Sequence, residues 1–295
     1  MRKTSKRHHT IAKGILKNFC YSENKFWYYS KKRRDEGVCS RDIERKFVRR
    51  NYYSIIDRFG VFDDRLEADL LQRLDCRFSE IVAGIDKSIE EDIEVRFDEE
   101  TERFVKCFLY YHLKRSPDFN EAVFSKLDPE RIIGQALEEY QRVVGPIPEA
   151  YLKRLSSDSA ISDVINHARV RQTGKLSGLI MSRIAGMQLA LAIAPEGTQF
   201  VIGSCATVRL EDVRPAELGD GNVEMWSPVT KKLMIGVYGK AALPLTRVAK
   251  LRLTKGQVRV INQQIFRLST EVASASDALL QSLVTSKEYA LRPHG

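Results

Sequence analysis

The spacing of apolar residues changes character at about Pro195. From residue 64 to about that point, apolar residues recur every three or four positions, which is the period of a helix that buries one face. This spacing predicts helices over residues 64–83, 99–114, 129–143, 159–171 and 176–193. After Pro195, short runs of branched residues predict strands over 199–204, 222–227, 232–238 and 243–253, and the returning helical period predicts helices over 255–272 and 276–286. Helices and strands segregated in this way are typical of an α+β protein.

The first 60 residues have a pattern of their own. Residues 13–19 suit a short helical turn, and residues 25–30 (KFWYYS) alternate in the way of a strand. Residues 44–54 suit either a second strand or the approach to a helix. The expected fold is therefore α+β: an N-terminal β-hairpin, a central helical bundle, and a C-terminal antiparallel β element with two closing helices.

The same patterns divide the chain into three parts. We expect a basic N-terminal segment with a hairpin over residues 1–60, a helical core over 61–194, and β-hairpins plus C-terminal helices over 195–295. The sequence Gly145-Pro146-Ile147-Pro148 breaks the helical period and marks the best candidate for a subdomain junction. At 295 residues the chain is long enough for one large domain, and we expect these parts to form one compact domain.

Several classes of protein are disfavoured by what the chain lacks. Its five cysteines are scattered and form no CxxC or Cys/His cluster, so a disulfide framework and a structural zinc site are both disfavoured and reduced cytoplasmic thiols fit best. The longest apolar run, residues 184–195, is too short to span a bilayer. Phosphate-binding glycine loops and the nucleophile elbow of hydrolases are absent. We therefore expect a cytoplasmic protein with no metal, no cofactor and no membrane partner.

Charge is distributed very unevenly. Residues 1–50 contain 16 Lys and Arg against five Asp and Glu, whereas residues 51–110 contain eight against 16. The two segments could pack and neutralise each other, or the basic one could meet a polyanion such as nucleic acid. Aromatic and basic side chains interleave at the candidate nucleic-acid-binding residues Lys25, Trp27, Lys31, Lys32, Arg33 and Arg34. A half-buried hairpin with a solvated basic turn explains the same stretch equally well.

Four segments occur in an order that resembles one known family. They are residues 9–19 (HTIAKGILKNF), 113–117 (LKRSP), 200–204 (FVIGS) and a helical stretch around Asn262. Together they resemble the uncharacterised, largely bacterial family called domain of unknown function 4238. The positions that match its motifs are His9, Asn18, Phe19, Arg115, Pro117, Ser204 and Asn262. The resemblance spans nearly the whole chain, and the family has no established activity that could be carried over.

The chain also departs from the family pattern. The proline of the first motif is Ala12, and the Asp-Asn-Pro that follows the family's serine is Cys205-Ala206-Thr207. An uncharged side chain cannot replace a carboxylate in orienting a histidine or binding a metal. Either this member is inactive, or the motif is structural.

Candidate catalytic residues are His9, Arg115 and Ser204, and each has a structural alternative. His9 could act as a base or touch a phosphate, or pack beneath the hairpin, whereas His8 is expected to be solvated. Arg115 could bind an anion or interact with the dipole at a helix end. His112 falls on an apolar helix face and Asn262 lies in a branched stretch, so both suggest buried hydrogen bonds. The family motif predicts that His9, Asn18, Arg115 and Ser204 converge.

Three functions follow from these observations. The first is a nucleic-acid-binding accessory protein, in a defence or mobile-element context. The second is a nuclease-like or other hydrolase centred on His9, Arg115 and Ser204, and the missing carboxylate after Ser204 argues against it. The third is a catalytically inactive partner subunit. The expected partners are accordingly nucleic acid, another protein, or a second copy of the chain.

Overall fold

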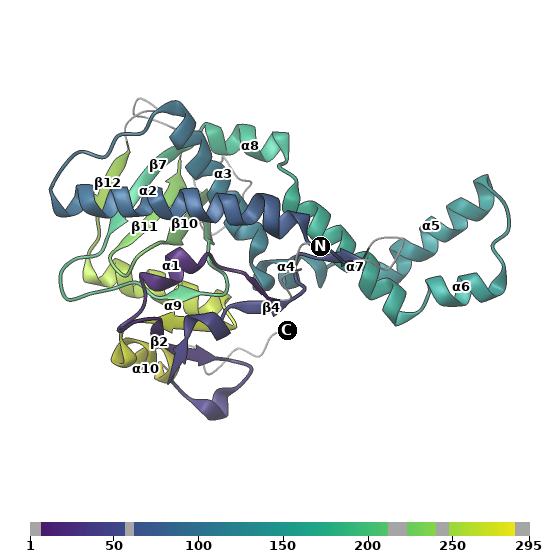
Figure 1. The fold of residues 1–295 in the computed structure, drawn as a ribbon, viewed down its shortest axis with the longest axis horizontal. Coiled ribbons are helices and arrows are strands. Elements are labelled where there is room, and N and C mark those ends of the chain that lie inside the picture. The colour runs from purple at the N-terminus through teal and green to yellow at the C-terminus, as the bar shows by residue number, and fades with distance from the viewer. Residues whose placement is uncertain (1–6, 57–61, 212–222, 240–247, 287–295) are drawn as a thin grey trace.

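The computed structural model describes residues 7–56, 62–211, 223–239 and 248–286. A five-stranded sheet forms its centre, in the order β12-β7-β11-β10-β9 (Figure 1). The strands are β7 (Gln188–Ile193), β9 (Val208–Glu211), β10 (Val223–Pro228), β11 (Leu233–Tyr238) and β12 (Ala249–Arg252). All neighbours are antiparallel except β12 and β7, which are parallel. Strand β12 lies within the expected strand 243–253, whose beginning falls outside the described residues.

A second sheet joins the two ends of the chain. Its order is β3-β2-β13-β8, with β2 (Lys25–Ser30), β3 (Cys39–Asp42), β8 (Ile202–Gly203) and β13 (Glu271–Ser274). The expected N-terminal hairpin is present as β2 and β3, and β13 pairs with the other edge of β2. The segment expected as a second strand instead contributes β4 (Val48–Arg50), which pairs with β1 (Arg7–His9). Strands β5 (Ile55–Ile56) and β6 (Phe62–Asp63) form a further short pair.

Two long helices cover the five-stranded sheet. A π-helical segment (Leu66–Leu71) runs directly into α2 (Gln72–Glu90), and α3 (Glu99–Arg115) packs on β10 and β11 (Figure 1). Asp98 caps α3 by accepting a hydrogen bond from the backbone N–H of Thr101. The expected end of this helix at residue 83 is wrong, because α2 continues through Gly84 to Glu90. Phe78 of α2 and Phe108 of α3 stack in the core with ring centroids 3.7 Å apart.

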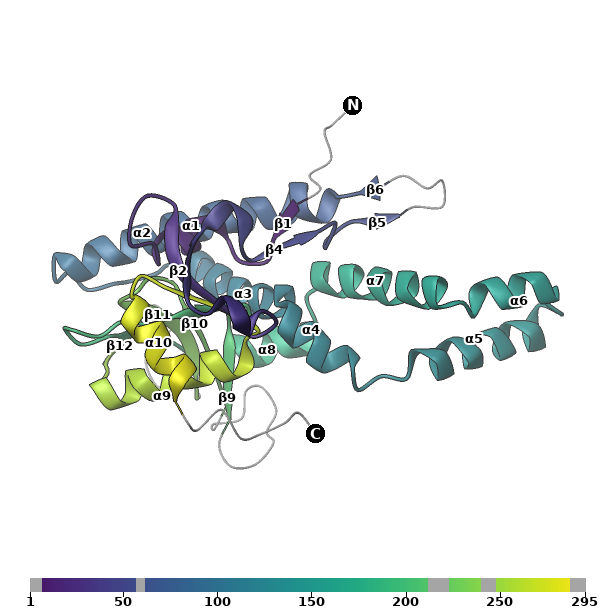
Figure 2. The same ribbon diagram turned by 90° about the horizontal axis from the view of Figure 1, so that it is seen from below.

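Four helices lead away from the body and back. They are α4 (Pro117–Phe124), α5 (Pro129–Val143), α6 (Glu149–Leu155) and α7 (Asp158–Gly174). Helices α5, α6 and the adjoining part of α7 form an arm that projects from the body (Figure 2). The remaining helical elements are α1 (Lys13–Lys17), α8 (Gly178–Ala185), α9 (Lys255–Leu268), α10 (Asp277–Thr285) and the short turns Arg34–Glu36 and Ile43–Arg45.

Two expected helices are partly strands. The stretch expected to be helical over 176–193 contains α8, which ends at Ala185 before Gly186, and then β7. Because β7 is buried on both faces, its apolar run does not alternate and has the composition of a buried helix. Similarly, α9 ends at Leu268 and β13 follows. The expected α+β class is confirmed, with an N-terminal strand hairpin, central helices and a C-terminal sheet with helices.

Candidate functional site

Arg115 is a large buried cation at the end of α3. The chain turns sharply there because Ser116 is extended before the proline that opens α4. The guanidinium pairs with the Asp75 carboxylate on α2, donates to the main-chain carbonyl of His9 at 3.0 Å, and reaches the Tyr53 hydroxyl at 3.4 Å. Burial acts to lower the pKa of Arg115, but the negative charge of Asp75 raises it overall. Arg115 therefore ties β1, α2 and α3 together.

The two neighbouring histidines differ in environment. His9 is half-buried, and its Nε2 lies 3.3 Å from the carbonyl oxygen of Ile43. Burial lowers the pKa of His9, so the imidazole is held neutral. His8 is fully buried, stacks on the Tyr53 ring, and accepts a hydrogen bond at Nδ1 from the Tyr53 N–H at 2.9 Å. The expectation that His8 is solvated is therefore wrong, because β1 turns this position inward.

Ser204 lies at the end of β8 in a dense hydrogen-bond network. Its hydroxyl donates to the Asp118 carboxylate and accepts from the backbone N–H groups of Thr270 at 3.1 Å and Glu271 at 3.0 Å. Asp118 also accepts from the Thr270 hydroxyl at 2.8 Å. The Ser116 hydroxyl donates to the Ser204 carbonyl at 2.9 Å. The carboxylate that contacts Ser204 thus comes from the beginning of α4, and the network joins α4 to β8 and β13.

The matched positions of the first motif point in different directions. Asn18 donates to the Val229 carbonyl at 2.9 Å, in the turn between β10 and β11. Phe19 is fully buried in the core. His9 meets Arg115 through its main chain, and Ser204 bonds to Ser116 rather than to either of them. The imidazole of His9 faces Ile43 and not the Ser204 hydroxyl.

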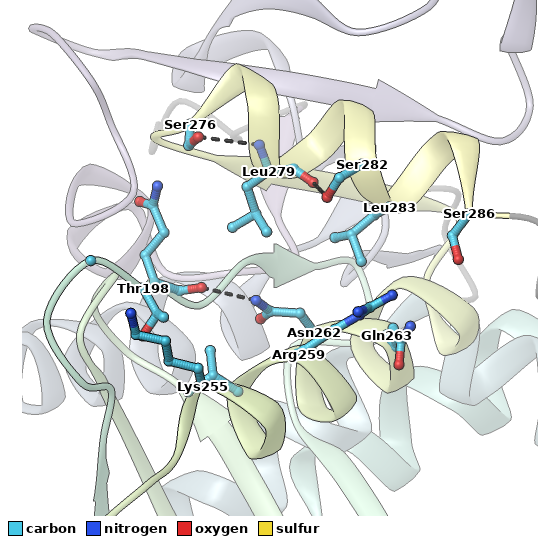
Figure 3. Close-up of a pocket in the computed structure, with 13 residues that line it drawn as sticks. Thr198, Lys255, Arg259, Asn262, Gln263, Ser276, Leu279, Ser282, Leu283 and Ser286 are labelled. Carbon is cyan, nitrogen blue, oxygen red and sulfur yellow. Dashed lines mark hydrogen bonds between the residues drawn. The ribbon is translucent and has the colours of Figure 1, made fainter.

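Asn262 lies in a groove of about 510 Å³ between α9 and α10 (Figure 3). Its side chain accepts from the Val201 N–H at 3.0 Å and donates to the Gln199 carbonyl at 2.9 Å. Both halves of the amide are therefore used in fixing the loop before β8. Lys255 and Arg259 also line the groove, and both are exposed.

A different cleft lies beside the Ser204 network, and we call it the α4–α7 cleft. It has a volume of about 280 Å³ and is bounded mainly by α4, α7 and the residues around β4. Its polar and charged lining residues are Lys32, Arg49, Tyr52, Asp118, Asn120, Glu121, Arg169 and Thr270. Three cations, two carboxylates and one tyrosine ring therefore face one cleft.

Arg169 on α7 is a half-buried cation of the α4–α7 cleft. Its guanidinium lies 3.5 Å from the centroid of the Tyr52 ring and donates to the Asn166 side chain. No carboxylate within the described ranges forms an ion pair with it. Burial lowers the pKa of Arg169, since its charge is desolvated without a compensating anion among those residues. The Tyr52 hydroxyl accepts from Asn120 at 3.1 Å, which fixes the ring beneath the guanidinium.

The other two cations of the cleft differ in how they are held. Arg49 pairs with Glu271 at 2.7 Å, and the other oxygen of that carboxylate accepts from the Tyr28 hydroxyl at 2.6 Å. Lys32 is exposed, and no ion pair forms with it in the part of the chain that the structure describes. Arg169 and Lys32 are thus the cleft cations whose charge no described carboxylate neutralises.

Two of the candidate nucleic-acid-binding residues in the basic turn make contacts within the protein. Lys31 donates to the carbonyls of Phe266 at 2.6 Å and Arg267 at 3.0 Å, so it caps the end of α9. Arg33 pairs with Glu36 on the surface at 3.0 Å.

The remaining candidates of that stretch are more exposed to solvent. Trp27 is half-buried and stacks on Tyr21 with centroids 5.3 Å apart. Lys25, Lys32 and Arg34 are exposed. Lys32 is the member of this group that lines the α4–α7 cleft.

Sequence reasoning missed most of the cleft. Asp118 directly follows the Ser-Pro pair that the family motif singled out, so an acidic residue in the first turn of a capped helix was a local signal for it. Arg49, Tyr52 and Arg169 carry no such signal, because they meet only through the packing of α7 against the N-terminal segment.

Two other kinds of site are not seen. Among the described residues, no three His, Cys, Asp or Glu side chains are placed to hold a metal ion. Within the same ranges, no helix has the length and apolar character that crossing a membrane would require.

The comparison with protein families confirms the resemblance. No curated protein and no solved structure is similar enough to this chain to support a comparison. The family model described as "Protein of unknown function (DUF4238)" matches residues 7–278. That stretch includes His9, Arg115, Ser204 and Asn262, together with every residue of the α4–α7 cleft. The chain therefore belongs to the DUF4238 family.

Proposed function

We propose that this protein binds single-stranded nucleic acid, with the phosphate backbone held in the α4–α7 cleft. The observation that carries the proposal is Arg169, a partly desolvated guanidinium that no described carboxylate pairs with, on the same cleft as the exposed Lys32. A desolvated cation without an anion is costly, and a bound phosphate would provide that anion through bidentate hydrogen bonds.

The surroundings of the cleft favour a chain of phosphates over one isolated anion. The protein has a formal charge of +9, and the basic turn with Lys32 and Arg34 continues the positive surface from the cleft. Nucleic acid attracts such a surface by releasing condensed counterions. A cleft of about 280 Å³ admits one backbone strand and not a double helix, so the proposal names a single strand.

The Ser204 network argues for support of this cleft over hydrolysis. A serine nucleophile needs a lone pair free to attack. The Ser204 hydroxyl donates to the Asp118 carboxylate, but the backbone N–H groups of Thr270 and Glu271 both donate to its oxygen. All of its hydrogen-bonding capacity is used in joining elements. We therefore place Asp118 and Ser204 as residues that hold α4, and with it one wall of the cleft.

A reducing compartment suits the thiols. All five cysteines are unpaired, and burial raises the pKa of Cys205 to about 12, which keeps that thiol protonated and unreactive. These properties support the expectation that the protein acts in the cytoplasm.

The test is binding of labelled oligothymidylate and oligouridylate, followed by fluorescence anisotropy at several salt concentrations. The variants Arg169→Gln and Lys32→Gln each remove one cleft cation. Lys87→Gln, at an exposed lysine on α2, removes the same charge elsewhere. We expect Arg169→Gln to weaken binding by about 10-fold or more, as removal of one hydrogen-bonded charge pair should. The slope of log K against log salt should fall by about 0.7 for each phosphate that the variant no longer neutralises.

Two results would overturn the proposal. One is the absence of measurable binding by the wild type at low salt. The other is equal weakening of binding in Lys87→Gln and Arg169→Gln, which would indicate attraction to net charge and no role for the cleft. The melting temperature of each variant should be measured alongside, because Arg169 also packs on Tyr52.

A further inference from the structure

Two aromatic rings stack on the surface of the N-terminal hairpin. The chain before β2 turns back on itself at Asn24, whose φ of 55° lies in the left-handed region that asparagine tolerates. The Tyr21 N–H donates to the Lys25 carbonyl at 2.9 Å across this turn, and the Tyr21 ring stacks on Trp27 with centroids 5.3 Å apart. Trp27 packs against the core, whereas Tyr21 is 43% exposed. The turn therefore holds a supported aromatic ring in contact with solvent.

A basic pocket lies directly beside this ring, and we call it the β3 pocket. It has a volume of about 520 Å³. Its lining residues are Ser40, Arg41, Asp42, Arg45 and Lys46. The hydroxyls of Ser40 and Tyr21 share a hydrogen bond at 2.6 Å, so the ring stands at the edge of the pocket. Three cations and one carboxylate thus surround a space next to an exposed aromatic ring.

The three cations of the β3 pocket are neutralised unequally. Arg41 pairs with Glu36 at 3.0 Å. Lys46 lies over the Tyr28 ring, with its ammonium 4.3 Å from the centroid, and Arg45 is exposed. No carboxylate in the described ranges forms an ion pair with Lys46 or Arg45. Two positive charges of the pocket are therefore available to an anion.

The β3 pocket adjoins the α4–α7 cleft. Lys46 of the pocket and Arg49 of the cleft are three residues apart, so at most about 11 Å of chain separates them. The Lys46 ammonium lies over the Tyr28 ring, whose hydroxyl donates to Glu271 at 2.6 Å. Arg49 binds the other oxygen of the same Glu271 carboxylate at 2.7 Å. The cations of the pocket and of the cleft are therefore close neighbours, joined through one buried pair.

We propose that the β3 pocket and the Tyr21 ring form a second subsite for the single strand, in which a base stacks on Tyr21 and the adjoining phosphates meet Arg45 and Lys46. This inference rests on the proposed function, since the strand reaches the subsite from the α4–α7 cleft by passing Arg49. Stacking on an aromatic ring combined with cations along the backbone holds a single strand without reading its sequence. The base must be unpaired and unstacked, which a single strand allows and a duplex resists.

The test is fluorescence anisotropy with labelled oligothymidylates of about 2 to about 16 nucleotides, a range that includes the usual sizes of single-strand sites. Wild-type affinity should rise with length until the strand reaches both the cleft and Tyr21. Tyr21→Ala should weaken the binding of long strands about five-fold or more, the loss expected for one stacked base, and leave the shortest strands unaffected. Tyr21→Phe keeps the ring and should bind like the wild type. Tyr151→Ala, which removes an exposed tyrosine from α6, should do the same.

Salt dependence separates the stacking from the charges. Arg45→Gln should weaken the binding of long strands and lower the slope of log K against log salt by about 0.7, the value for one phosphate. Tyr21→Ala should weaken binding and leave the slope unchanged, because the ring carries no charge. Lys87→Gln, at an exposed lysine on α2, should change neither quantity.

Photocross-linking locates the base independently. A long oligonucleotide that carries 5-iodouracil should cross-link to Tyr21 on irradiation. Tryptic digestion separates residues 18–25, which contain Tyr21, from residues 26–31, which contain Trp27, so mass spectrometry identifies the ring that was reached. The cross-link to residues 18–25 should disappear in Tyr21→Ala.

The outcomes separate this inference from the proposed function. If the wild type binds and Arg169→Gln weakens it, but Tyr21→Ala and Arg45→Gln do not, the cleft holds the strand and the second subsite is wrong. A cross-link confined to peptides other than residues 18–25 would also overturn the subsite. A wild type that binds no oligonucleotide would overturn both proposals. Circular dichroism of each variant checks that the fold is retained.

Discussion

His112 should make the protein sensitive to acid. It is fully buried on α3, with Nδ1 at 3.1 Å from the Ser227 hydroxyl. Ser227 donates its one hydroxyl proton to the Ala206 carbonyl at 3.0 Å, so it must accept from Nδ1–H of the histidine. Nε2 then carries the lone pair, and it has no partner among the described atoms. Protonation would place a charged N–H group where none of those atoms accepts it.

The size of the effect follows from the pKa. Burial lowers the pKa of His112 from 6.5 to about 3, and the positive charge of Arg115 acts in the same direction. A depressed pKa means that stability is fully present above the unfolded value of 6.5 and declines as the pH falls through that value toward the folded one. At about pH 5 the two pKa values correspond to a decrease of about 2 kcal/mol relative to about pH 8.

Urea unfolding of the wild type and His112→Leu at about pH 8 and about pH 5 measures this effect. The substitution costs stability at both values, because the shape of the side chain and its contact with Ser227 change. The informative quantity is the difference between the two pH values, which should shrink by about 2 kcal/mol in the variant. His9 remains in both proteins and cancels. His167→Leu, at a half-exposed position on α7, controls for the removal of a histidine elsewhere. An unchanged difference would refute the argument about Nε2.

Two further substitutions test the core and the buried carboxyl group of Glu67, which lies in the π-helical segment before α2 and interacts electrostatically with Arg115. Phe108→Ala removes a buried ring that stacks on Phe78 at 3.7 Å, and it should cost about 3 to 5 kcal/mol in chemical unfolding; a cost below about 1 kcal/mol would contradict the packing described. Burial raises the pKa of Glu67 to about 7, so the stability linked to its protonation is full below 4.5 and declines as the pH rises through 7. Glu67→Gln should therefore raise the free energy of unfolding by about 1 to 3 kcal/mol at about pH 8 and change it little at about pH 4.5. Equal effects at both pH values would show that the carboxylate is not buried in its charged form.

Helices whose sequence begins with an N-cap residue and continues at helical spacing were predictable. Helix α3 was expected over 99–114 and spans Glu99–Arg115, and Pro129 opens α5 as expected. In both cases an aspartate at the N-cap precedes apolar residues at helical spacing. Strand β7 was not predicted because both of its faces are covered, which removes the alternation that distinguishes a strand.

The candidate site was far less accessible to sequence reasoning. The motif residues Arg115 and Ser204 were identified, but their neighbours Asp75 and Asp118 depend on helix packing that no local pattern encodes. Arg169 resembles any other surface arginine until α7 places it over Tyr52. In the short strand β1, a register shift of one residue would exchange which of His8 and His9 is buried, and the neighbouring residues suit either register equally well.

The placement of β13 next to β2 has a consequence for the order in which the protein is made. The Tyr28 hydroxyl and the Glu271 carboxylate that bond across this pair are 243 residues apart in the chain. At about 5 to 20 residues per second, roughly 10 to 50 seconds separate their synthesis on the ribosome. During that interval the N-terminal hairpin has one strand edge unpaired, and a free edge invites pairing with another chain. The second sheet is thus completed late, and a cell making this protein quickly would expose its N-terminal strands to neighbouring nascent chains before their partner strand exists.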